Sequence, residues 1–421
     1  MQLSFGDADI LAEVRAGFQG APPKKMAVAV SGGGDSVALL HALSRCFDPE
    51  AVEIVAATVD HGLRPEAADE AAGVGVLARR LGIPHTVLRW RDHDGSGNLQ
   101  DNARRARFRL LANWALAQDI RMVVLGHTAD DQAETLLMRL ARAAGADGLA
   151  AMRRSRTQHG VTFLRPMLGL TRAELREYLT RNGVTWIEDP SNSDPSYDRV
   201  KARQLMPALA PLGISARTLA EVAENMGRAR DALNWYTFLA AREIAEVSGG
   251  AVALDARSFR TLPEEIARRL IIHAIRWIAG GEYPPRRAPV AAMVAAARAG
   301  KASTLAGCRL VGHSGRAWLC REHEAVQGLR VPAGALWDGR WRLVSEASAP
   351  DGAEIAALGA EGLQRCPDRR LGGLPRAALL ASPALWVGTE LVAAPLAGLG
   401  NGWSAELEGG AEAFYAAILS H

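Results

Sequence analysis

Short apolar runs and amphipathic stretches alternate through the first two hundred residues of the chain. The apolar runs have the length of buried strands and cover 26–30, 52–59, 85–90 and 122–125. Apolar residues recur with helical spacing over 37–43, 65–81, 100–118, 131–142 and 171–182. At the start of the last of these stretches, Thr171 and Glu174 have the spacing of a capping box. Strands that alternate with helices in this way predict an α/β fold with a parallel sheet covered by helices.

The pattern changes near residue 205. Long helices are predicted over 215–247 and 263–278, and from about residue 325 the chain is rich in Gly, Pro and Ala with short strand-like pieces. We therefore expect three domains: a catalytic domain at 1–207, a mainly helical domain at 208–328, and a small C-terminal region at 329–421 for which the sequence indicates no role.

A glycine-rich loop, "SGGGDS", lies between the first predicted strand and its helix. Glycines let backbone N–H groups approach a ligand closely, and a helix start favours an anion such as phosphate. Asp35 repels phosphate unless a cation lies between them, so it is expected to hold Mg²⁺ or to orient the loop. Neither GxxxxGK[ST] nor GxGxxG occurs in the chain. The alternative is a turn without a ligand; the candidate phosphate-binding residues are Ser31, Gly32, Gly33, Gly34, Asp35 and Ser36.

A second polar cluster, "GHTADDQAET", follows the fourth predicted strand. In an open α/β sheet the ligand crevice lies at the carboxyl ends of the strands. Asp131 and Glu134 are three residues apart and share a helix face. Asp130 with Glu134 alone would also fit a helix cap and its capping partner. The cluster nevertheless favours a metal or substrate role for His127, Asp130, Asp131 and Glu134. Asp60 and His61 are expected at the same edge.

Arginine dominates the basic residues, since only four of the 49 Lys and Arg residues are lysines. Arg104 and Arg105 belong to a helix crowded with arginines, some of which are expected to face solvent and others an RNA backbone. Residues 206–330 carry 17 Lys and Arg against 11 Asp and Glu, whereas 331–421 carry 6 against 10. The middle segment, with Arg268 and Arg269, is therefore the better candidate for holding a further anion.

Composition adds few constraints. The 421 residues carry a formal net charge of +3 and are 48% hydrophobic, which is ordinary for a globular protein. The four cysteines form no CxxC pair, so a reducing, cytoplasmic setting is expected. The N-terminus has no apolar signal core, and polar residues and prolines interrupt the apolar stretch at 377–399, so no membrane span is expected. The choice between a monomer and a homodimer stays open.

Several blocks resemble a known family. "SGGGDS" resembles the PP-loop of the ATP pyrophosphatases, whose domain has an adenine nucleotide alpha-hydrolase-like fold. "VDHGLR", "NARRARFRLL", "GHTADDQAETLLMRLARAAGADGLAAM", "RPMLGLTRAELREYL" and "WIEDPSNSDPSYDRVKARQLMP" together are similar to the bacterial tRNA(Ile)-lysidine synthase family. The resemblance covers residues 26–207. The chain departs from the family at Arg199-Val200, where the family usually has Arg-Asn, so the hydrogen bond of that Asn is in doubt.

The resemblance implies a cytoplasmic ligase that uses ATP and Mg²⁺. ATP adenylates the C2 carbonyl oxygen of the wobble cytidine of tRNA(Ile) with a CAU anticodon, and L-lysine then displaces AMP at C2. Lysidine, AMP and pyrophosphate result, and the codon read changes from AUG to AUA. The implied catalytic residues are Asp35, His127, Asp130, Asp131 and Glu134, with Asp35 and Asp131 at a metal. The expected tRNA contacts are Arg104, Arg105, Arg199, Arg203, Arg268 and Arg269.

Three alternatives remain from the residues themselves. A PP-loop enzyme that thiolates tRNA would depend on paired cysteines, which this chain lacks. An amide-forming ATP pyrophosphatase acting on small acids would not need the arginine-rich helix. A non-enzymatic nucleotide- or RNA-binding module would not need an acidic cluster beside the loop.

Overall fold

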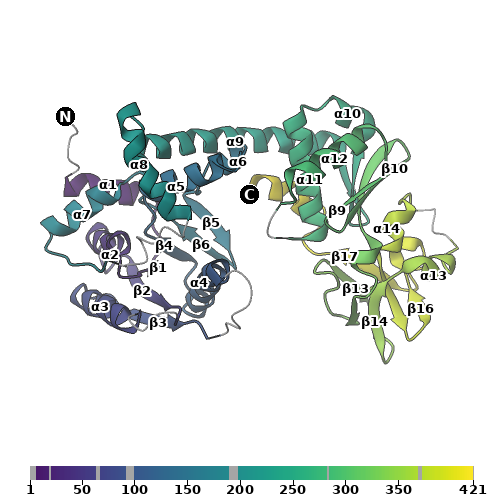
Figure 1. The fold of residues 1–421 in the computed structure, drawn as a ribbon. Coiled ribbons are helices and arrows are strands. Elements are labelled where there is room, and N and C mark those ends of the chain that lie inside the picture. The colour runs from purple at the N-terminus through teal and green to yellow at the C-terminus, as the bar shows by residue number, and fades with distance from the viewer. Residues whose placement is uncertain are drawn as a thin grey trace. The chain divides into compact units, whose positions relative to one another are not determined.

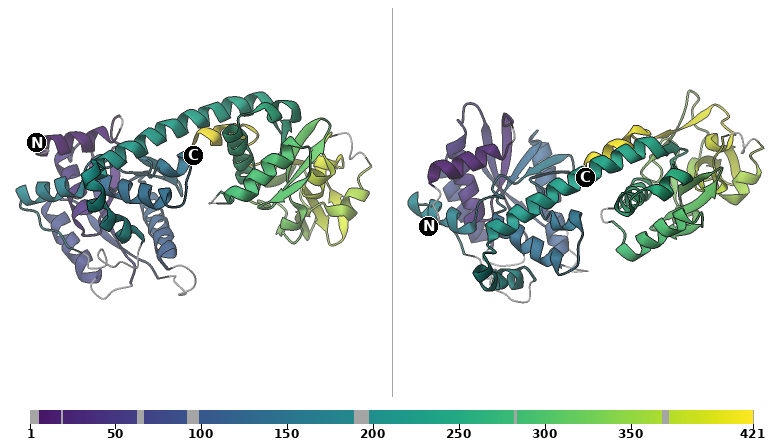
Figure 2. Two further views of the ribbon diagram at one scale, coloured as in Figure 1. Left: turned by 45° about the horizontal axis from the view of Figure 1, so that its top comes forward. Right: turned by 90° about the horizontal axis from the view of Figure 1, so that it is seen from above.

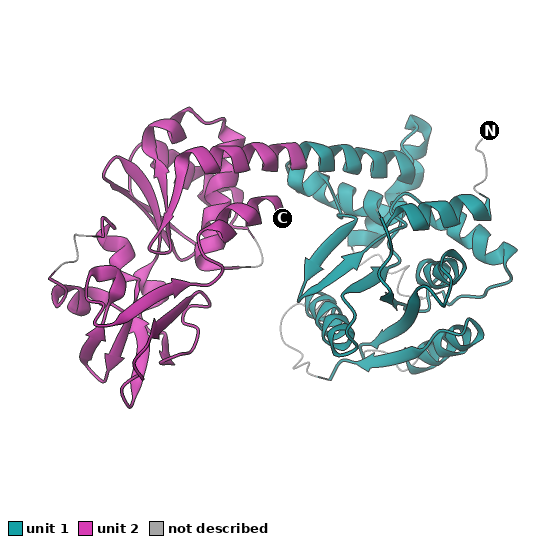
Figure 3. Ribbon diagram, turned by 180° about the vertical axis from the view of Figure 1, so that it is seen from behind, with its two compact units in different colours: residues 1–230 teal, residues 231–421 magenta. Residues whose placement is uncertain are grey.

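The computed structural model describes residues 6–18, 20–62, 67–91, 99–188, 198–281, 284–367 and 372–420. It divides into two compact units, residues 1–230 and 231–421, and the boundary falls inside one continuous helix, α9 (Ala216–Ile244) (Figure 3). The expected boundaries at 207 and 328 differ from this division. Leu219 and Ala223 of α9 pack against Ala133 and Leu136, so the start of α9 belongs to the core of the first unit.

The first unit is built on a six-stranded sheet with the order β3-β2-β1-β4-β6-β5 (Figure 1). Four neighbouring pairs are parallel, and only β5 runs antiparallel, in a hairpin with β6. The strands are β1 (Lys25–Ala29), β2 (Glu53–Asp60), β3 (His85–Arg89), β4 (Met122–Leu125), β5 (Ser155–Gln158) and β6 (Val161–Leu164). The predicted parallel α/β sheet is confirmed, while the hairpin was not foreseen.

Helices cover both faces of this sheet because its strands alternate their side chains between two cores. Met26, Val28 and Val30 face one core, which α1, α2, α3 and α7 complete, whereas Ala27 and Ala29 face another core with α4. The helices are α1 (Asp7–Ala16), α2 (Gly34–Cys46), α3 (Ala67–Arg80), α4 (Leu99–Ala117), α5 (Ala129–Leu140), α6 (Ala146–Leu149), α7 (Arg172–Arg181) and α8 (Asp198–Leu209).

Strand order fixes where a ligand can bind in this unit. The chain adds β2 and β3 on one side of β1, and then β4 and β6 on the other side. The switch between the two directions lies between β1 and β4, where Ala29 pairs with Leu125. The segments after these two strands, Ser31–Ser36 and Gly126–Thr128, therefore meet at the carboxyl edge, the usual position of the ligand crevice.

The second unit holds a five-stranded antiparallel sheet, β7-β8-β11-β10-β9, beside α10, α11 and α12. The expectation of a mainly helical segment missed this sheet, whose strands are β7 (Ala245–Ser248), β8 (Ala251–Asp255), β9 (Ser303–Leu305), β10 (Cys308–His313) and β11 (Arg316–Arg321). The predicted helix over 215–247 ends at Ile244, where β7 begins. Figure 2 shows α9 unbroken up to this point. The helices are α10 (Ala256–Thr261), α11 (Glu264–Ala279) and α12 (Arg287–Arg298).

The last ninety residues form two small sheets, with orders β12-β14-β15-β16 and β13-β17. Their strands are β12 (Arg330–Pro332), β13 (Trp341–Ser345), β14 (Ala353–Ala357), β15 (Pro383–Val387), β16 (Glu390–Ala393) and β17 (Trp403–Leu407). The helices here are α13 (Gly359–Gln364), α14 (Arg376–Leu380) and α15 (Glu412–Ser420). Phe414 and Ile418 of α15 return to the core of α11. In the described part of the chain, no helix is long and apolar enough to cross a bilayer.

Gly126 sets how closely the two edge segments approach. A Cβ at this position would lie 3.0 Å from the Asp35 carbonyl oxygen and 3.0 Å from the Ser36 Cα atom. Both are backbone atoms at the start of α2, so they move only if the glycine-rich loop moves with them.

We expect Gly126→Ala to lower the free energy of unfolding by about 1–3 kcal/mol, the usual cost of overpacking. Gly328→Ala is the control, because Gly328 is exposed in a turn and no atom lies within 4 Å of the added methyl group. The control should change stability by less than about 0.5 kcal/mol. Equal denaturation midpoints for both variants would contradict the close approach.

Candidate functional site

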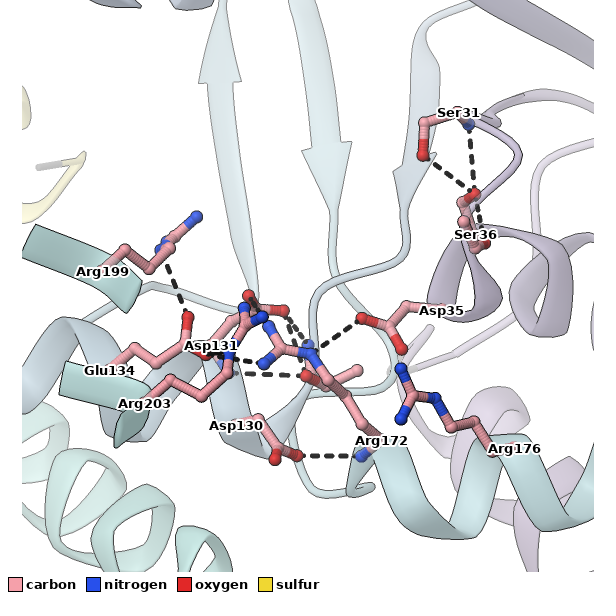
Figure 4. A network of polar contacts seen from close by, with 12 residues as sticks. Ser31, Asp35, Ser36, Asp130, Asp131, Glu134, Arg172, Arg176, Arg199 and Arg203 are labelled. Carbon is pink, nitrogen blue, oxygen red and sulfur yellow. Dashed lines mark hydrogen bonds and ion pairs between the residues drawn. The ribbon is translucent and has the colours of Figure 1, made fainter. Parts of the chain in front are cut away.

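The glycine-rich loop forms the tight connection that its sequence predicts. Gly32 has φ +91°, a conformation that favours glycine, and Gly33 is the N-cap of α2. Ser36 donates its hydroxyl to the Gly33 carbonyl at 2.9 Å and accepts from the Ser31 N–H at 3.1 Å (Figure 4). Ser36 is buried, so its hydroxyl shapes the loop from inside. Backbone N–H groups at the start of α2 and the exposed Ser31 remain at the outer side of the loop.

The helix that carries the acidic cluster is capped by a residue that precedes the acids. Thr128, not Asp130, is the N-cap of α5, and Asp131 is its capping-box partner. Asp131 Oδ2 accepts from the Thr128 N–H at 2.9 Å and from the Thr128 hydroxyl at 3.0 Å. Asp130 Oδ2 accepts the backbone N–H of Arg172 at 2.8 Å, so it caps the neighbouring helix α7. Neither Asp130 nor Glu134 plays the capping role within α5 that the sequence allowed.

A single guanidinium joins three of the predicted acids. Arg172 donates from Nε to Asp35 Oδ2 at 3.1 Å, from Nη1 to Glu134 Oε1 at 2.6 Å, and from Nη2 to Asp131 Oδ1 at 2.6 Å (Figure 4). The Arg172 side chain is 16% exposed, so these contacts are largely shielded from water. Asp131 and Glu134 share a helix face as predicted, and Asp35 faces them from α2.

Glu134 is the most enclosed acid of the cluster and contacts three arginines. Its side chain is 2% exposed. Besides Arg172, Arg203 donates from Nε to Oε1 at 2.9 Å, and Arg199 Nε lies 3.3 Å from Oε2. Arg199 and Arg203 were expected at tRNA phosphates, but the structure places them on this carboxylate. Val200, at the departure from the family pattern, is buried in α8.

Burial and neighbouring charges shift the pKa values of Asp35 and Asp131 in opposite directions. Burial raises the pKa of Asp35 to about 6; the charges of Asp131 and Asp130 act in the same direction, and Arg172 opposes them. Burial also acts to raise the pKa of Asp131, but the charge of Arg172, together with smaller contributions that include Arg199 and the Thr128 N–H, outweighs it, so the pKa lies below its ordinary value. Asp35 is therefore the acid of this pair that changes protonation nearest to neutral pH.

His127 lies beside the acids as a neutral ring. Burial lowers the pKa of His127 to about 3, with Arg165 and Arg107 acting in the same direction against Asp131. Its Nδ1 atom is buried without a hydrogen-bond partner. In this state the imidazole is a poor proton acceptor near pH 7, which argues against His127 as a general base.

The other predicted arginines contact residues outside the acidic cluster. Arg105 pairs with Asp101 at 2.7 Å on the exposed side of α4, and Arg104 lies over the Phe108 ring. In the second unit, Arg268 is bidentate to Glu265. Arg269 is buried and bonds Glu265 and Asn234. The charge of Arg269 is therefore used inside the unit, and its contact with a phosphate stays a prediction.

Asp60 and His61 also reach the carboxyl edge, at the end of β2. Asp60 Oδ1 accepts the Gly62 N–H at 2.8 Å, and the His61 ring lies edge-on to Trp90. Leu63 and Arg64 of the same block lie outside the described residues, as does most of the "EDPSNSD" block. No contact with the acidic cluster is seen for Asp60 or His61 among the described residues.

Sequence reasoning missed two arginines of the site. Arg172 stands at the first position of α7, directly after the Thr171 cap that the sequence did predict. Arg165 follows β6 at the same edge; it is 5% exposed, and its Nε atom has no hydrogen-bond partner. Burial lowers the pKa of Arg165 to about 10, so it stays charged at neutral pH. Both residues lie in the block "RPMLGLTRAELREYL". The resemblance of this block to the family was the one feature of the sequence that could have indicated them.

Carboxylates suit Mg²⁺, so the acids of this site are candidates for holding the ion. Among the described residues, no group of three or more His, Cys, Asp or Glu side chains is arranged to hold a metal ion. Asp131 has both oxygens engaged, by Arg172 and Thr128. Asp35 accepts a hydrogen bond through Oδ2. Mg²⁺ commonly takes one or two carboxylates together with substrate phosphates, and Asp35 beside the glycine-rich loop fits that requirement better than Asp131.

One known protein resembles this chain over its whole length, and others resemble it over parts of that length. Residues 8–209 match the family model described as a PP-loop domain. A tRNA(Ile)-lysidine synthase from Ruegeria pomeroyi is 58% identical over 421 residues, which cover all of both chains. The enzyme of the same name from Wolbachia pipientis is 36% identical over 75% of this chain and 76% of its own.

A comparison of structures finds a U34-tRNA thiolase, NcsA, from Methanococcus maripaludis at 16% identity and a TM-score of 0.45, covering 53% of this chain and 78% of that one. The 58% identity across the full chain, together with the PP-loop domain, shows that the chain belongs to the tRNA(Ile)-lysidine synthase family.

Proposed function

We propose that the chain catalyses the ATP-dependent ligation of lysine to C2 of the wobble cytidine of tRNA(Ile) with a CAU anticodon, forming lysidine, AMP and pyrophosphate. The observation that carries this proposal is the 58% identity along the full length of a tRNA(Ile)-lysidine synthase. The placement of the glycine-rich loop beside an acidic cluster at the sheet's switch point supports it.

In the first step the C2 carbonyl oxygen of cytidine attacks the α-phosphorus of ATP. An oxygen–phosphorus bond forms, the bond to the bridging oxygen of the β-phosphate breaks, and pyrophosphate leaves. The N–H groups at the start of α2 are suited to bind the departing phosphates, and Ser31 adds a hydroxyl at the same place. Ser36 contributes indirectly, by holding the loop in shape.

In the second step an amino group of lysine attacks C2. The bond from C2 to the adenylated oxygen breaks, AMP leaves with that oxygen, and the amine loses a proton. Carboxylates are needed first to bind the lysine ammonium and then to accept the proton. Asp131, whose pKa is lowered, suits the binding of a cation. Asp35 has a pKa of about 6 when no cation is bound, so it suits the exchange of a proton near neutral pH once Mg²⁺ has left with pyrophosphate.

Asp35 is also the residue we assign to Mg²⁺. It stands in the first turn of α2, next to the loop that would receive the phosphates. The ion would neutralise charge on the pyrophosphate leaving group. Asp131 is the weaker candidate for this role because its oxygens are already engaged.

Buried thiols count against the tRNA-thiolation alternative. Cys46, Cys308, Cys320 and Cys366 are all free and buried. Burial raises the pKa of Cys308 and of Cys320 to about 12, and it raises that of Cys46 as well. Thiols held in this way are poor nucleophiles, whereas sulfur transfer requires reactive ones.

Mass spectrometry of tRNA(Ile) incubated with the protein, ATP and lysine tests the proposed function directly. The modified nucleoside should gain the mass of one lysine less one water, because AMP carries away the oxygen of C2. Reactions without lysine, or with ornithine in its place, are the controls. An unchanged tRNA, or a product that contains sulfur, would refute the proposal.

Asp35→Asn should reduce pyrophosphate release by about 10²-fold or more, as expected when a positioned acid–base or metal-binding group is lost. Glu53→Gln removes the same charge at the opposite edge of the sheet, where Glu53 pairs with Lys25 at 3.1 Å, and should leave turnover unchanged. Near-normal turnover in folded Asp35→Asn protein would rule out both roles assigned to Asp35.

Phosphate contacts by Arg104 and Arg105 would make tRNA binding depend on salt. Replacing both by Gln should reduce the log–log slope of affinity against salt by about 0.7–0.9 for each tRNA phosphate that is no longer neutralised. Arg342→Gln with Arg376→Gln, exposed positions of the acidic C-terminal region, is the matched double control. If the two double variants show equal slopes, the arginines of α4 do not contact tRNA.

A further inference from the structure

Arg172 contacts more acids of the site than any other described residue in it. Its three side-chain nitrogens reach three carboxylates, and its backbone N–H reaches a fourth, that of Asp130. Neither the glycine-rich loop nor the acidic cluster contains it, since it stands 38 residues beyond Glu134 in the chain. A single side chain thus completes an acidic site whose other members come from earlier segments.

The acids joined by Arg172 come from two helices, and Arg172 comes from a third. Asp35 lies in the first turn of α2, which follows β1, and Asp131 and Glu134 lie in α5, which follows β4. Arg172 opens α7, whose start is fixed by the capping box of Thr171 and Glu174. The spacing of Asp35 from the two acids of α5 is therefore set through one planar group on a well-capped helix.

Charge explains why an arginine occupies this position. Three carboxylates that converge in a shielded site repel one another unless a cation lies among them. Burial opposes the charge of Arg172, but Asp131, Glu134 and Asp35 raise its pKa above the ordinary value, so it stays charged. A guanidinium directs several N–H groups in one plane, whereas a lysine ammonium acts as a point charge.

We propose that Arg172 is a positioning residue of the reaction: its guanidinium holds the carboxylates of Asp35, Asp131 and Glu134 together as one receptor for the cations that the substrates bring. This inference rests on the proposed function, in which lysine supplies an ammonium group and ATP arrives with a divalent cation. Arg172 bonds the same carboxylate oxygens that those cations need. It therefore aligns the receptor and at the same time limits its affinity for cations.

Two effects of opposite sign follow from removing the guanidinium. The carboxylates lose their alignment, which lowers kcat, because small misplacements of reacting groups are costly. The receptor gains net negative charge, so the lysine ammonium binds at least as tightly as before and the KM for lysine does not rise. A merely structural residue would alter the melting temperature and leave the kinetic constants of the folded protein unchanged.

The experiment compares Arg172→Gln, Arg172→Lys and Arg176→Gln in the full-length protein. Arg176 lies one turn further along α7, is half exposed and pairs with Glu188, so it is the matched control (Figure 4). Lysidine formation is measured at varied lysine with saturating ATP and tRNA, and a thermal melt of each variant is recorded. We expect Arg172→Gln to lose about 10²-fold in kcat without a rise in the KM for lysine. Arg172→Lys should be intermediate, and Arg176→Gln should match wild type.

Three results would overturn the inference. Folded Arg172→Gln with wild-type kcat would reduce Arg172 to a packing role. A large rise in the KM for lysine at unchanged kcat would make it a substrate contact instead. If Arg172→Gln shows no cooperative melt, Arg172→Lys decides, and full kcat in that variant refutes the positioning role. Absence of lysidine with the wild-type protein would refute the proposed function itself, which separates the two failures.

Discussion

Carboxylates that converge at one edge of a parallel sheet need cations among them, and this requirement governs the arrangement of the first unit. Asp35, Asp131 and Glu134 come together because the strands that precede them are neighbours at the switch point of the sheet. Their mutual repulsion is offset by Arg172, and at Glu134 also by arginines of α8. The site is thus a balance of charges assembled from four helices.

The sheet makes this balance possible by bringing backbone segments unusually close. Gly126 lets the turn after β4 touch the backbone at Asp35 and Ser36, so the loop and the acidic cluster share one space. The same proximity explains the pKa of Asp35, which burial raises to about 6 even though an arginine contacts it. The close approach of the two segments and the raised pKa of Asp35 therefore have one cause: α2 and α5 begin side by side, because they follow the neighbouring strands β1 and β4.

Local patterns predicted what depends on neighbouring residues in the chain. The alternation of apolar runs placed β1 to β4, and the spacing of Thr171 and Glu174 marked the start of α7 correctly. Patterns of this kind carry no information on which distant side chain will meet a given acid. Arg172 was missed for that reason, and the alternative of a cap formed by Asp130 with Glu134 fails because the true cap, Thr128, lies two residues earlier.

The second unit was harder to predict for a different physical reason. Its strands are short, and one of them, Ala245–Ser248, follows a helical pattern without a break. The sequence made Arg269 a candidate for holding an anion, yet it is buried against Asn234 and Glu265. Contacts between residues far apart in the chain determine both the strand at Ala245–Ser248 and the burial of Arg269. The spacing of residues along the chain could therefore predict neither.

A double-mutant cycle between Asp35 and Arg172 is the most direct test of the central claim that the site acts as one charge-balanced unit. Pyrophosphate release is measured for Asp35→Asn, Arg172→Gln and the double variant, each shown to be folded. Groups that act as a unit give strongly non-additive effects, so the double variant should lose no more than the more damaging single change. If the two losses multiply, the residues act independently and the account is contradicted.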